Sequence, residues 1–283
     1  MRKFALILSC FASAAVADDY QIVTSIAPVQ GLVAELAAGA QTPELLVPAG
    51  ADPHEFSLRP SQIRSLQTAD LIVLAGNGME PWWDDVADLI SADATVLILG
   101  SGPSVAQYAV PMRQDPGVRD PHMWTDPDVA GIWAERITLM LRAIDPENAG
   151  TYDTNLQSTL LALAEVAVTS QAQLAPIKDV QLVFGHDSLQ YFELAFGLKF
   201  GGALSDAHGT EAGAQTVSSI AGLEGPACLV IDINEADDHG HALIEDAPSV
   251  QLDPLGSTLL GQPNFAAALI AHLAEALASC APS

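Results

Sequence analysis

Short apolar runs alternate along the chain with longer segments in which apolar residues recur every three or four positions. The short runs predict β-strands, and the longer segments predict helices. Predicted strands cover residues 21–26, 71–75, 95–99, 180–184 and 227–231, and predicted helices cover residues 28–38, 81–90, 188–196 and 264–279. This alternation is typical of mostly parallel sheets flanked by helices. Because it occurs in both halves of the chain, we expect two α/β lobes.

One segment between the two halves has a different pattern. Residues 146–175 contain no proline after Pro146 and no glycine except Gly150, and their leucines recur at helical spacing. Asp145 suits the cap of this helix, Pro146 suits its first position, and Pro176 ends it. A helix of about 28 residues is about 42 Å long, which suits a rigid connector between two lobes.

The first residues predict an export signal. Arg2 and Lys3 precede an apolar stretch over residues 4–16, and Ala-Val-Ala at residues 15–17 fits a cleavage site. Lipid attachment at Cys10 is an alternative, but the residues before it form a poor lipobox. No later stretch reaches the about 20 apolar residues that a membrane span needs. We therefore expect a signal peptide over residues 1–17, an N-terminal lobe over 18–145, a connecting helix over 146–176 and a C-terminal lobe over 177–283.

Composition and charge narrow the function. Of 283 residues, 49% are hydrophobic, which is ample for a core. The chain has 35 acidic and 10 basic residues, a formal net charge of −25. This balance excludes nucleic-acid binding as the main function and disfavours docking on anionic lipids. An acidic surface attracts cations.

Two cysteines, Cys228 and Cys280, remain after the signal peptide. In an oxidising compartment they suggest one disulfide, which would close a loop of about 52 residues. Two separate buried thiols are the alternative.

Three of the seven histidines lie where a ligand cleft is expected. His54, His122 and His186 occupy predicted loops, and Asp253 follows a strand-like run. Loops at the carboxyl ends of parallel strands converge on one cleft, so these side chains can meet there. Three imidazoles and one carboxylate favour Zn²⁺, because Ca²⁺ and Mg²⁺ prefer oxygen ligands and Mn²⁺ prefers more carboxylates.

Each of these residues also has an ordinary structural interpretation. A single loop histidine is more often a hydrogen-bonding residue than a ligand, and spacings of more than 60 residues form no local metal motif. Asp253 before Pro254 also suits a turn. The sequence assigns no ligand role to the other four histidines. His208 is a loop residue that could act as a gate, and His272 is interpreted as structural. His239 and His241 fit either a weak metal site at the surface or a solvated loop.

Four stretches carry a resemblance to a known family. They are PAGADPHEFSLRPS at residues 48–61, DPHMWTDP at 120–127, FGHDSLQYF at 184–192 and LDPLG at 252–256. Together they resemble the metal-binding receptors of ABC importers called cluster A-I, and within them the periplasmic zinc-binding proteins of the ZnuA type. The matches run along almost the whole mature chain.

The resemblance implies a site, a fold and partners. It implies Zn²⁺ bound by His54, His122, His186 and Asp253 in a cleft between two α/β lobes that one long rigid helix joins. In this family a histidine at the third position marks the zinc branch and a glutamate there marks the manganese branch, so His186 indicates zinc. It further implies a periplasmic, monomeric protein that delivers zinc to a membrane permease driven by a cytoplasmic ATPase, with a metallochaperone as a further partner. Zinc-branch members often carry a disulfide where Cys228 and Cys280 lie.

The chain departs from the family in the segment before the second ligand. Many zinc members have a histidine-rich loop before the second ligand, but residues 102–119 contain no histidine. His239 and His241 are candidates for a replacement auxiliary site. Glu55 is an alternative to Asp253 as fourth ligand.

Three other functions remain as alternatives: a manganese or iron receptor of the same family, a zinc hydrolase, and an adhesin that keeps only the fold. A hydrolase needs a general base near the metal, for which Glu55 and Asp187 are the candidates. We expect a binding protein that is not an enzyme, with a zinc affinity that falls as histidines protonate below about pH 6.5.

Overall fold

The computed structural model describes residues 20–233, 240, 242–244 and 247–282. The predicted signal peptide, Cys10, His239 and His241 lie outside the described residues. Among the helices of the described part, none is long and apolar enough to cross a membrane.

Four parallel strands form the sheet of the first lobe, in the order β2-β1-β3-β4. Its elements are β1 (Ile22–Thr24), α1 (Ala27–Leu36), β2 (Glu44–Leu45), α2 (Pro60–Thr68), β3 (Leu71–Leu74), α3 (Trp83–Val86), β4 (Thr95–Ile98), α4 (Pro103–Ala106) and α5 (Pro127–Ile144). Apolar side chains of α2 and α3 pack on one face of the sheet, and those of α1 and α5 pack on the other. The strand β3 is buried along its whole length, as a continuous apolar run predicts.

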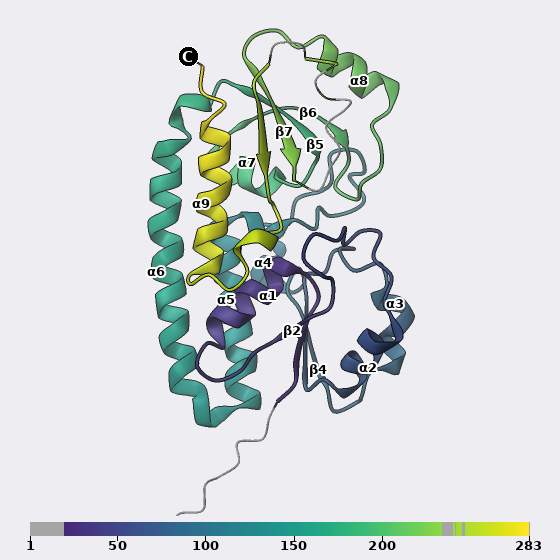
Figure 1. The fold of residues 1–283 in the computed structure, drawn as a ribbon, viewed down its shortest axis with the longest axis vertical. Coiled ribbons are helices and arrows are strands. Elements are labelled where there is room, and N and C mark those ends of the chain that lie inside the picture. The colour runs from purple at the N-terminus through teal and green to yellow at the C-terminus, as the bar shows by residue number, and fades with distance from the viewer. Residues whose placement is uncertain (1–19, 234–239, 241, 245–246, 283) are drawn as a thin grey trace, which may run out of the picture.

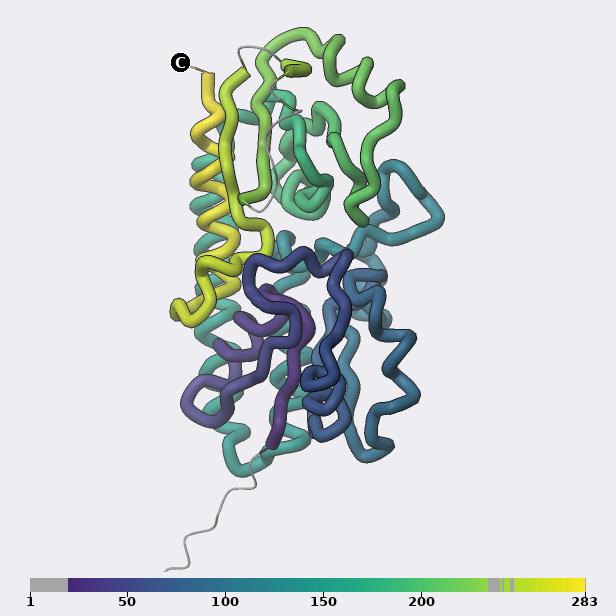
Figure 2. Tube along the Cα trace, turned by 45° about the vertical axis from the view of Figure 1, so that its right-hand side comes forward, coloured from purple at the N-terminus to yellow at the C-terminus, as the bar shows by residue number. Residues whose placement is uncertain are grey.

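The second lobe repeats this arrangement, with a parallel sheet in the order β6-β5-β7-β8. Its elements are β5 (Gln181–His186), α7 (Gln190–Phe196), β6 (Lys199–Ser205), α8 (Ala214–Ala221), β7 (Ala227–Asp232), β8 (Ser249–Leu252) and α9 (Phe265–Ala278). The prediction of two α/β lobes is confirmed (Figure 1). Figure 2 shows the two lobes one above the other.

Sequence reasoning missed several elements, among them α5 and β6. Helix α5 begins where the Asp126 carboxylate accepts hydrogen bonds from the backbone amides of Asp128 and Val129, a cap that the sequence signals. The strand β6 contains Gly201 and Gly202, which weaken a strand pattern. A Cβ atom at Gly202 would lie 2.5 Å from the Ile220 side chain of α8, so close packing explains that glycine.

The predicted long helix is present as α6 (Ala149–Gln173), with 3₁₀ turns before and after it. It runs beside both lobes (Figure 1) and packs against α1, α5 and α9. As expected, Asp145 is the N-cap residue of the first 3₁₀ turn and Pro146 is its first residue, but the Asp145 side chain makes no capping hydrogen bond there. The Asp145 carboxylate accepts hydrogen bonds from the Tyr152 hydroxyl (2.6 Å) and the Asn148 side chain (2.8 Å), because the tight first turn brings these groups to it.

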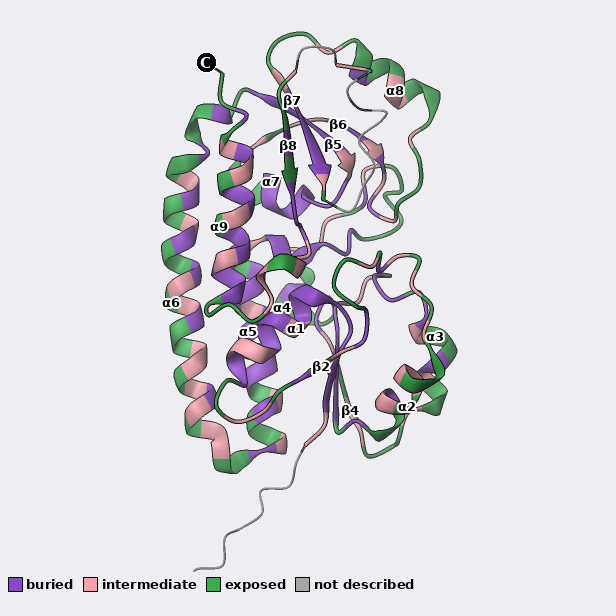
Figure 3. Cartoon of the chain, viewed as in Figure 1, coloured by how far each residue is buried: buried purple, intermediate pink, exposed green. Residues whose placement is uncertain are grey.

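Helix α9 provides a second link between the lobes. It packs against β8 of the second lobe and against α1 of the first. Figure 3 shows that α9 and the inner face of α6 are lined by buried residues. One continuous apolar core therefore runs through both lobes. The predicted disulfide is confirmed: Cys228 in β7 is bonded to Cys280 just after α9, with Cα atoms 5.7 Å apart.

Candidate metal centre

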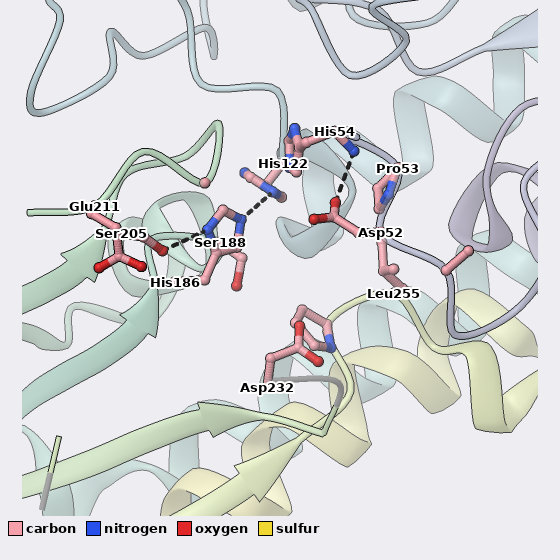
Figure 4. A pocket seen from close by; sticks show the side chains of 13 residues that line it. Asp52, Pro53, His54, His122, His186, Ser188, Ser205, Glu211, Asp232 and Leu255 are labelled. Atoms are coloured by element: carbon pink, nitrogen blue, oxygen red, sulfur yellow. Dashed lines mark hydrogen bonds between the residues drawn. The ribbon is translucent and has the colours of Figure 1, made fainter. Parts of the chain in front are cut away.

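Two loops and the end of strand β5 bring His54, His122 and His186 together between the lobes (Figure 4). One ring nitrogen from each lies within 4.8 Å of the other two. The ring centroids are 5.2 to 5.5 Å apart. Imidazoles bound at 2.0–2.1 Å to one tetrahedral Zn²⁺ would have centroids about 5.2 Å apart. The spacing of the three rings therefore fits a single zinc ion.

The same local device holds two of these histidines. His54 follows β2 and His122 follows the loop after α4, each two residues after an aspartate. The carboxylates of Asp52 and Asp120 accept a hydrogen bond from the backbone amide of His54 and His122 respectively, both at 2.8 Å. These turns fix the backbone from which each imidazole projects.

Hydrogen bonds also fix the tautomer of His122. Its Nδ1 lies 2.9 Å from the buried Asp120 carboxylate, so the Nδ1–H donates to Asp120 and Nε2 is left with a lone pair. Sequence reasoning gave Asp120 no role, although the repeated Asp-Pro-His pattern was a signal for it.

His186 ends β5 and has the same tautomer. The Ser205 hydroxyl donates its one proton to the Gly185 carbonyl (3.0 Å), so its oxygen accepts the Nδ1–H of His186 at 3.3 Å. The two Nε2 atoms of His122 and His186 then face one another at 3.4 Å, each with a lone pair.

Electrostatics keep the three rings neutral. Burial, together with repulsion between neighbouring imidazoliums, lowers the pKa of His54, His122 and His186 to about 3. Protons therefore compete with a metal for these nitrogens only well below pH 6.5. The sequence-based expectation of pH 6.5 assumed the pKa of an unburied histidine. Burial also raises the pKa of Asp120 to about 7.

The structure places Asp253 beside this group but not within it. Its buried carboxylate accepts hydrogen bonds through Oδ2 from the Thr258 backbone amide (2.8 Å) and hydroxyl (2.9 Å). Its Oδ1 is buried without a hydrogen-bond partner in the described part of the chain. The next two residues, Pro254 and Leu255, line the same pocket as the three histidines. Asp253 as a ligand stays a prediction.

The other candidates are dispersed. Glu55 is exposed, and His239 and His241 lie outside the described residues. His272 accepts a long hydrogen bond (3.3 Å) from the Asp253 backbone amide, a structural contact.

A pocket of about 200 Å³ contains the three histidines in its lining. Three acidic residues also line it and favour a cation: Asp52, Glu211 and Asp232.

An arginine that sequence reasoning missed ties the two lobes behind the histidines. Arg113, from the segment before His122, pairs with the buried carboxylates of Asp187 and Glu193 (3.0 Å to the latter). Its guanidinium also stacks on the Phe200 ring at 3.7 Å. Burial raises the pKa of Asp187 to about 6 and that of Glu193 to about 8.

The hydroxyl of Tyr191, in α7, reinforces this tie. It accepts a hydrogen bond from the Val110 backbone amide (3.2 Å) and donates to the Asp120 carbonyl (3.0 Å). The segment that precedes His122 is thus anchored to the helix that follows His186. Residues 102–119, which contain no histidine, therefore include an anchor between the two lobes.

Comparisons with known proteins show the family to which this chain belongs. The chain matches the profile of the family described as zinc-uptake complex component A, periplasmic, over residues 22–280. The high-affinity zinc uptake system protein ZnuA of Paracoccus denitrificans (strain Pd 1222) is 28% identical over 301 residues, which cover 93% of this chain and 92% of that protein. The corresponding protein of Brucella abortus (strain 2308) is 27% identical over 320 residues, covering 97% and 96%.

A crystal structure of a zinc-bound ZnuA deletion mutant has the same fold. Its TM-score is 0.79 at 23% identity, and the match covers 94% of this chain and 99% of that one. The match to the family profile spans nearly the whole described chain, and the resemblance seen in the sequence is confirmed. This chain belongs to the family of periplasmic A components of zinc-uptake complexes.

Proposed function

We propose that this protein is an exported zinc receptor that binds Zn²⁺ between its lobes and delivers it to an ABC importer. The observation that supports this most directly is the pair of Nε2 atoms of His122 and His186, 3.4 Å apart. Their hydrogen bonds place both protons on Nδ1, so two lone pairs face one another. A cation between them removes this repulsion, and His54 supplies the third nitrogen for it.

Asp253 is the fourth ligand in this proposal. Its free, buried Oδ1 supports the assignment, and Thr258 holds the other carboxylate oxygen in place. The exposed Glu55 is the alternative, and water is a third candidate for that position. His239 and His241 are proposed as an auxiliary site.

Delivery requires partners in the membrane. We propose an inner-membrane permease with its cytoplasmic ATPase as the receiving transporter, and a periplasmic metallochaperone as a source of metal. We further propose that residues 1–17 are removed on export, that the mature chain works as a monomer in the periplasm, and that the lobes divide at residues 145 and 177 around the connecting helix.

Catalysis and a manganese site are less well supported. The two candidate general bases are unsuited, because the Asp187 carboxylate is engaged by Arg113 and Glu55 is exposed. The three grouped ligands are all imidazoles, a set that suits zinc better than manganese or iron.

A calorimetric titration of metal-stripped mature protein tests the proposal. We expect one tight Zn²⁺ site that excess Mn²⁺ does not displace. Because His186→Ala removes one of three nitrogens, it should weaken binding by more than about 100-fold, beyond the usual effect of removing a supporting residue. Tighter binding of Mn²⁺, or no tight Zn²⁺ site, would overturn the assignment.

Two further variants separate the secondary assignments. Asp253→Asn tests whether Asp253 is the fourth ligand. If this variant binds zinc as tightly as wild type, Asp253 is not a ligand. The double variant His239→Ala/His241→Ala should lose only a second, weaker binding event, with the tight site unchanged.

A further inference from the structure

His208 is a fourth histidine at the centre that the proposed ligand set does not use. It lies at the tip of a short turn after β6, in the second lobe. The Asp206 carboxylate accepts hydrogen bonds from the backbone amides of His208 and Thr210, both at 2.9 Å. The Asp206 backbone amide in turn donates to the Thr210 carbonyl at 2.8 Å. These hydrogen bonds fix the backbone of the turn from which the His208 imidazole projects.

This turn repeats the device that holds two of the metal-site histidines. In all three cases an aspartate lies two residues before a histidine, and its carboxylate accepts that histidine's backbone amide: Asp52 and His54, Asp120 and His122, Asp206 and His208. His208 is therefore presented in the same way as residues that we assign to zinc.

The imidazole of His208 reaches across to the first lobe. A Cβ atom on Gly78, in the loop after β3, would lie 2.8 Å from His208 Cε1, so the ring rests against that glycine. The ring centroid of His208 is 5.7 Å from that of His54. Both His208 Nε2 and His54 Nδ1 are buried with no hydrogen-bond partner in the described residues. Two partially enclosed imidazoles on opposite lobes thus each have an unused nitrogen.

His208 does not belong to the group of three. Among the described residues, only His54, His122 and His186 have ligand atoms that all lie within 4.8 Å of one another. Its ring pairs with the ring of His54, the member of that group from the first lobe's loop after β2. Its chain neighbours Gly209 and Glu211 line the pocket that leads to the three rings. The three histidines line this pocket too, so the turn that carries His208 borders the same pocket as the proposed site.

We propose that His208 is a metal-exchange ligand: it binds Zn²⁺ together with His54 while the ion enters or leaves, before His122 and His186 complete the site. The inference rests on the proposed function and adds a route to it. Because His54 is shared by both arrangements, the ion keeps one protein ligand throughout the transfer. Each step then replaces one ligand, which avoids stripping several waters from Zn²⁺ at once.

Rates of zinc exchange test this. The mature protein is mixed with Zn²⁺ to measure capture, and the zinc-loaded protein is mixed with excess EDTA to measure release. In His208→Ala and His208→Gln, we expect both rates to fall at least fivefold. The equilibrium zinc affinity should stay within threefold of wild type, because the resident ligands are untouched. The absorption spectrum of the Co²⁺-loaded protein should not change.

Glu211→Gln is the matched control, because it removes a pocket charge next to the turn and leaves every imidazole in place. It should lower the capture rate at low salt only, with no effect on release. Thermal unfolding of each variant checks the fold, and His208→Gln keeps a side chain against Gly78.

Three results would overturn the inference. The first is exchange rates within twofold of wild type in both His208 variants. The second is faster zinc release in either variant, which would make His208 a lid. The third is a tenfold loss of zinc affinity with a changed Co²⁺ spectrum, which would make His208 a resident ligand. A failure of the proposed function is distinguishable from these results, because wild type itself would then show no tight Zn²⁺ binding in the calorimetric titration.

Discussion

At the scale of single residues, hydrogen bonds to neighbouring side chains set which ring nitrogen His122 and His186 offer to a metal. Asp120 and Ser205 hold the Nδ1–H of His122 and His186, and both Nε2 atoms are left for the ion. Such contacts orient a ligand and raise its basicity before any metal arrives. His122 and His186 therefore need no change of tautomer to bind a cation.

This arrangement predicts the pH dependence of zinc binding. The three imidazoles, with a pKa of about 3, are neutral at pH 6 and release no proton when zinc binds. Asp120, with a pKa of about 7, is largely protonated at pH 6, and the ion at His122 favours its charged form. Zinc affinity should therefore fall below pH 7, by up to about tenfold per pH unit, through one proton.

Calorimetry at pH 6 in buffers of different ionisation enthalpy measures that proton. About one proton per zinc is expected for wild type and near zero for Asp120→Asn, which keeps an acceptor for the Nδ1–H. Release of two or three protons, or no effect of Asp120→Asn, would contradict the assignment.

At the scale of elements, helix α1 packs so closely on α9 that a glycine is required between them. A Cβ atom at Gly31 would lie 2.4 Å from Cδ1 of the buried Phe265. Gly31→Ala should destabilise the protein by about 1–2 kcal/mol, because overpacking outweighs the roughly 1 kcal/mol gain in helix propensity. Gly150→Ala, in α6 with nothing within 4 Å, is the control. Gly150→Ala should stabilise the protein slightly. Chemical denaturation measures the change in the free energy of unfolding for both variants, which should have opposite signs.

The segment before His122 depends on Arg113 in a different way. Without this cation, the buried carboxylates of Asp187 and Glu193 either repel one another or take up protons. Arg113→Ala should cost about 1–3 kcal/mol of stability, and more at pH 8 than at pH 6, where protons neutralise the acids.

Thermal unfolding at both pH values checks this, with Arg142→Ala as the matched arginine. Arg142 pairs with Asp153 at 3.1 Å, but both side chains are 50% exposed. Its loss should have little effect at either pH. An Arg113 variant as stable as wild type at pH 8 would show that the anchor is not needed.

At the scale of the whole molecule, several ties limit movement between the lobes. Helices α6 and α9 run along both, and the disulfide fixes α9 to β7. Glu35 of α1 accepts hydrogen bonds from Thr159 of α6 (2.6 Å) and from the Ala266 backbone amide of α9 (3.2 Å). The Trp124 indole donates to the Pro254 carbonyl at 2.8 Å, which links the segment that carries His122 to the Asp253 turn.

These ties predict little closure when zinc binds. The radius of gyration from small-angle X-ray scattering should differ by less than about 1 Å between metal-free and zinc-loaded protein. His186→Ala with added zinc serves as the unloaded control. A larger compaction on loading would show that the lobes close around a hinge.

The sequence by itself determined the layered architecture, because buried parallel strands and a long helix leave strong local patterns in residues 71–74 and 149–173. It also pointed to His54, His122 and His186 through loop position and family motifs. Elements with weak local signals, such as the glycine-containing β6, were missed because packing against α8 stabilises them.

Only the tertiary structure decided how those residues act together. Asp120 and Ser205 act through space on imidazoles, and His208 meets His54 from the opposite lobe. Arg113 finds Asp187 and Glu193 more than 70 residues away along the chain. Local periodicity carries no information on such long-range contacts, because they arise only when the lobes pack on their shared core. Burial then shifts the pKa of each group, which no sequence pattern contains.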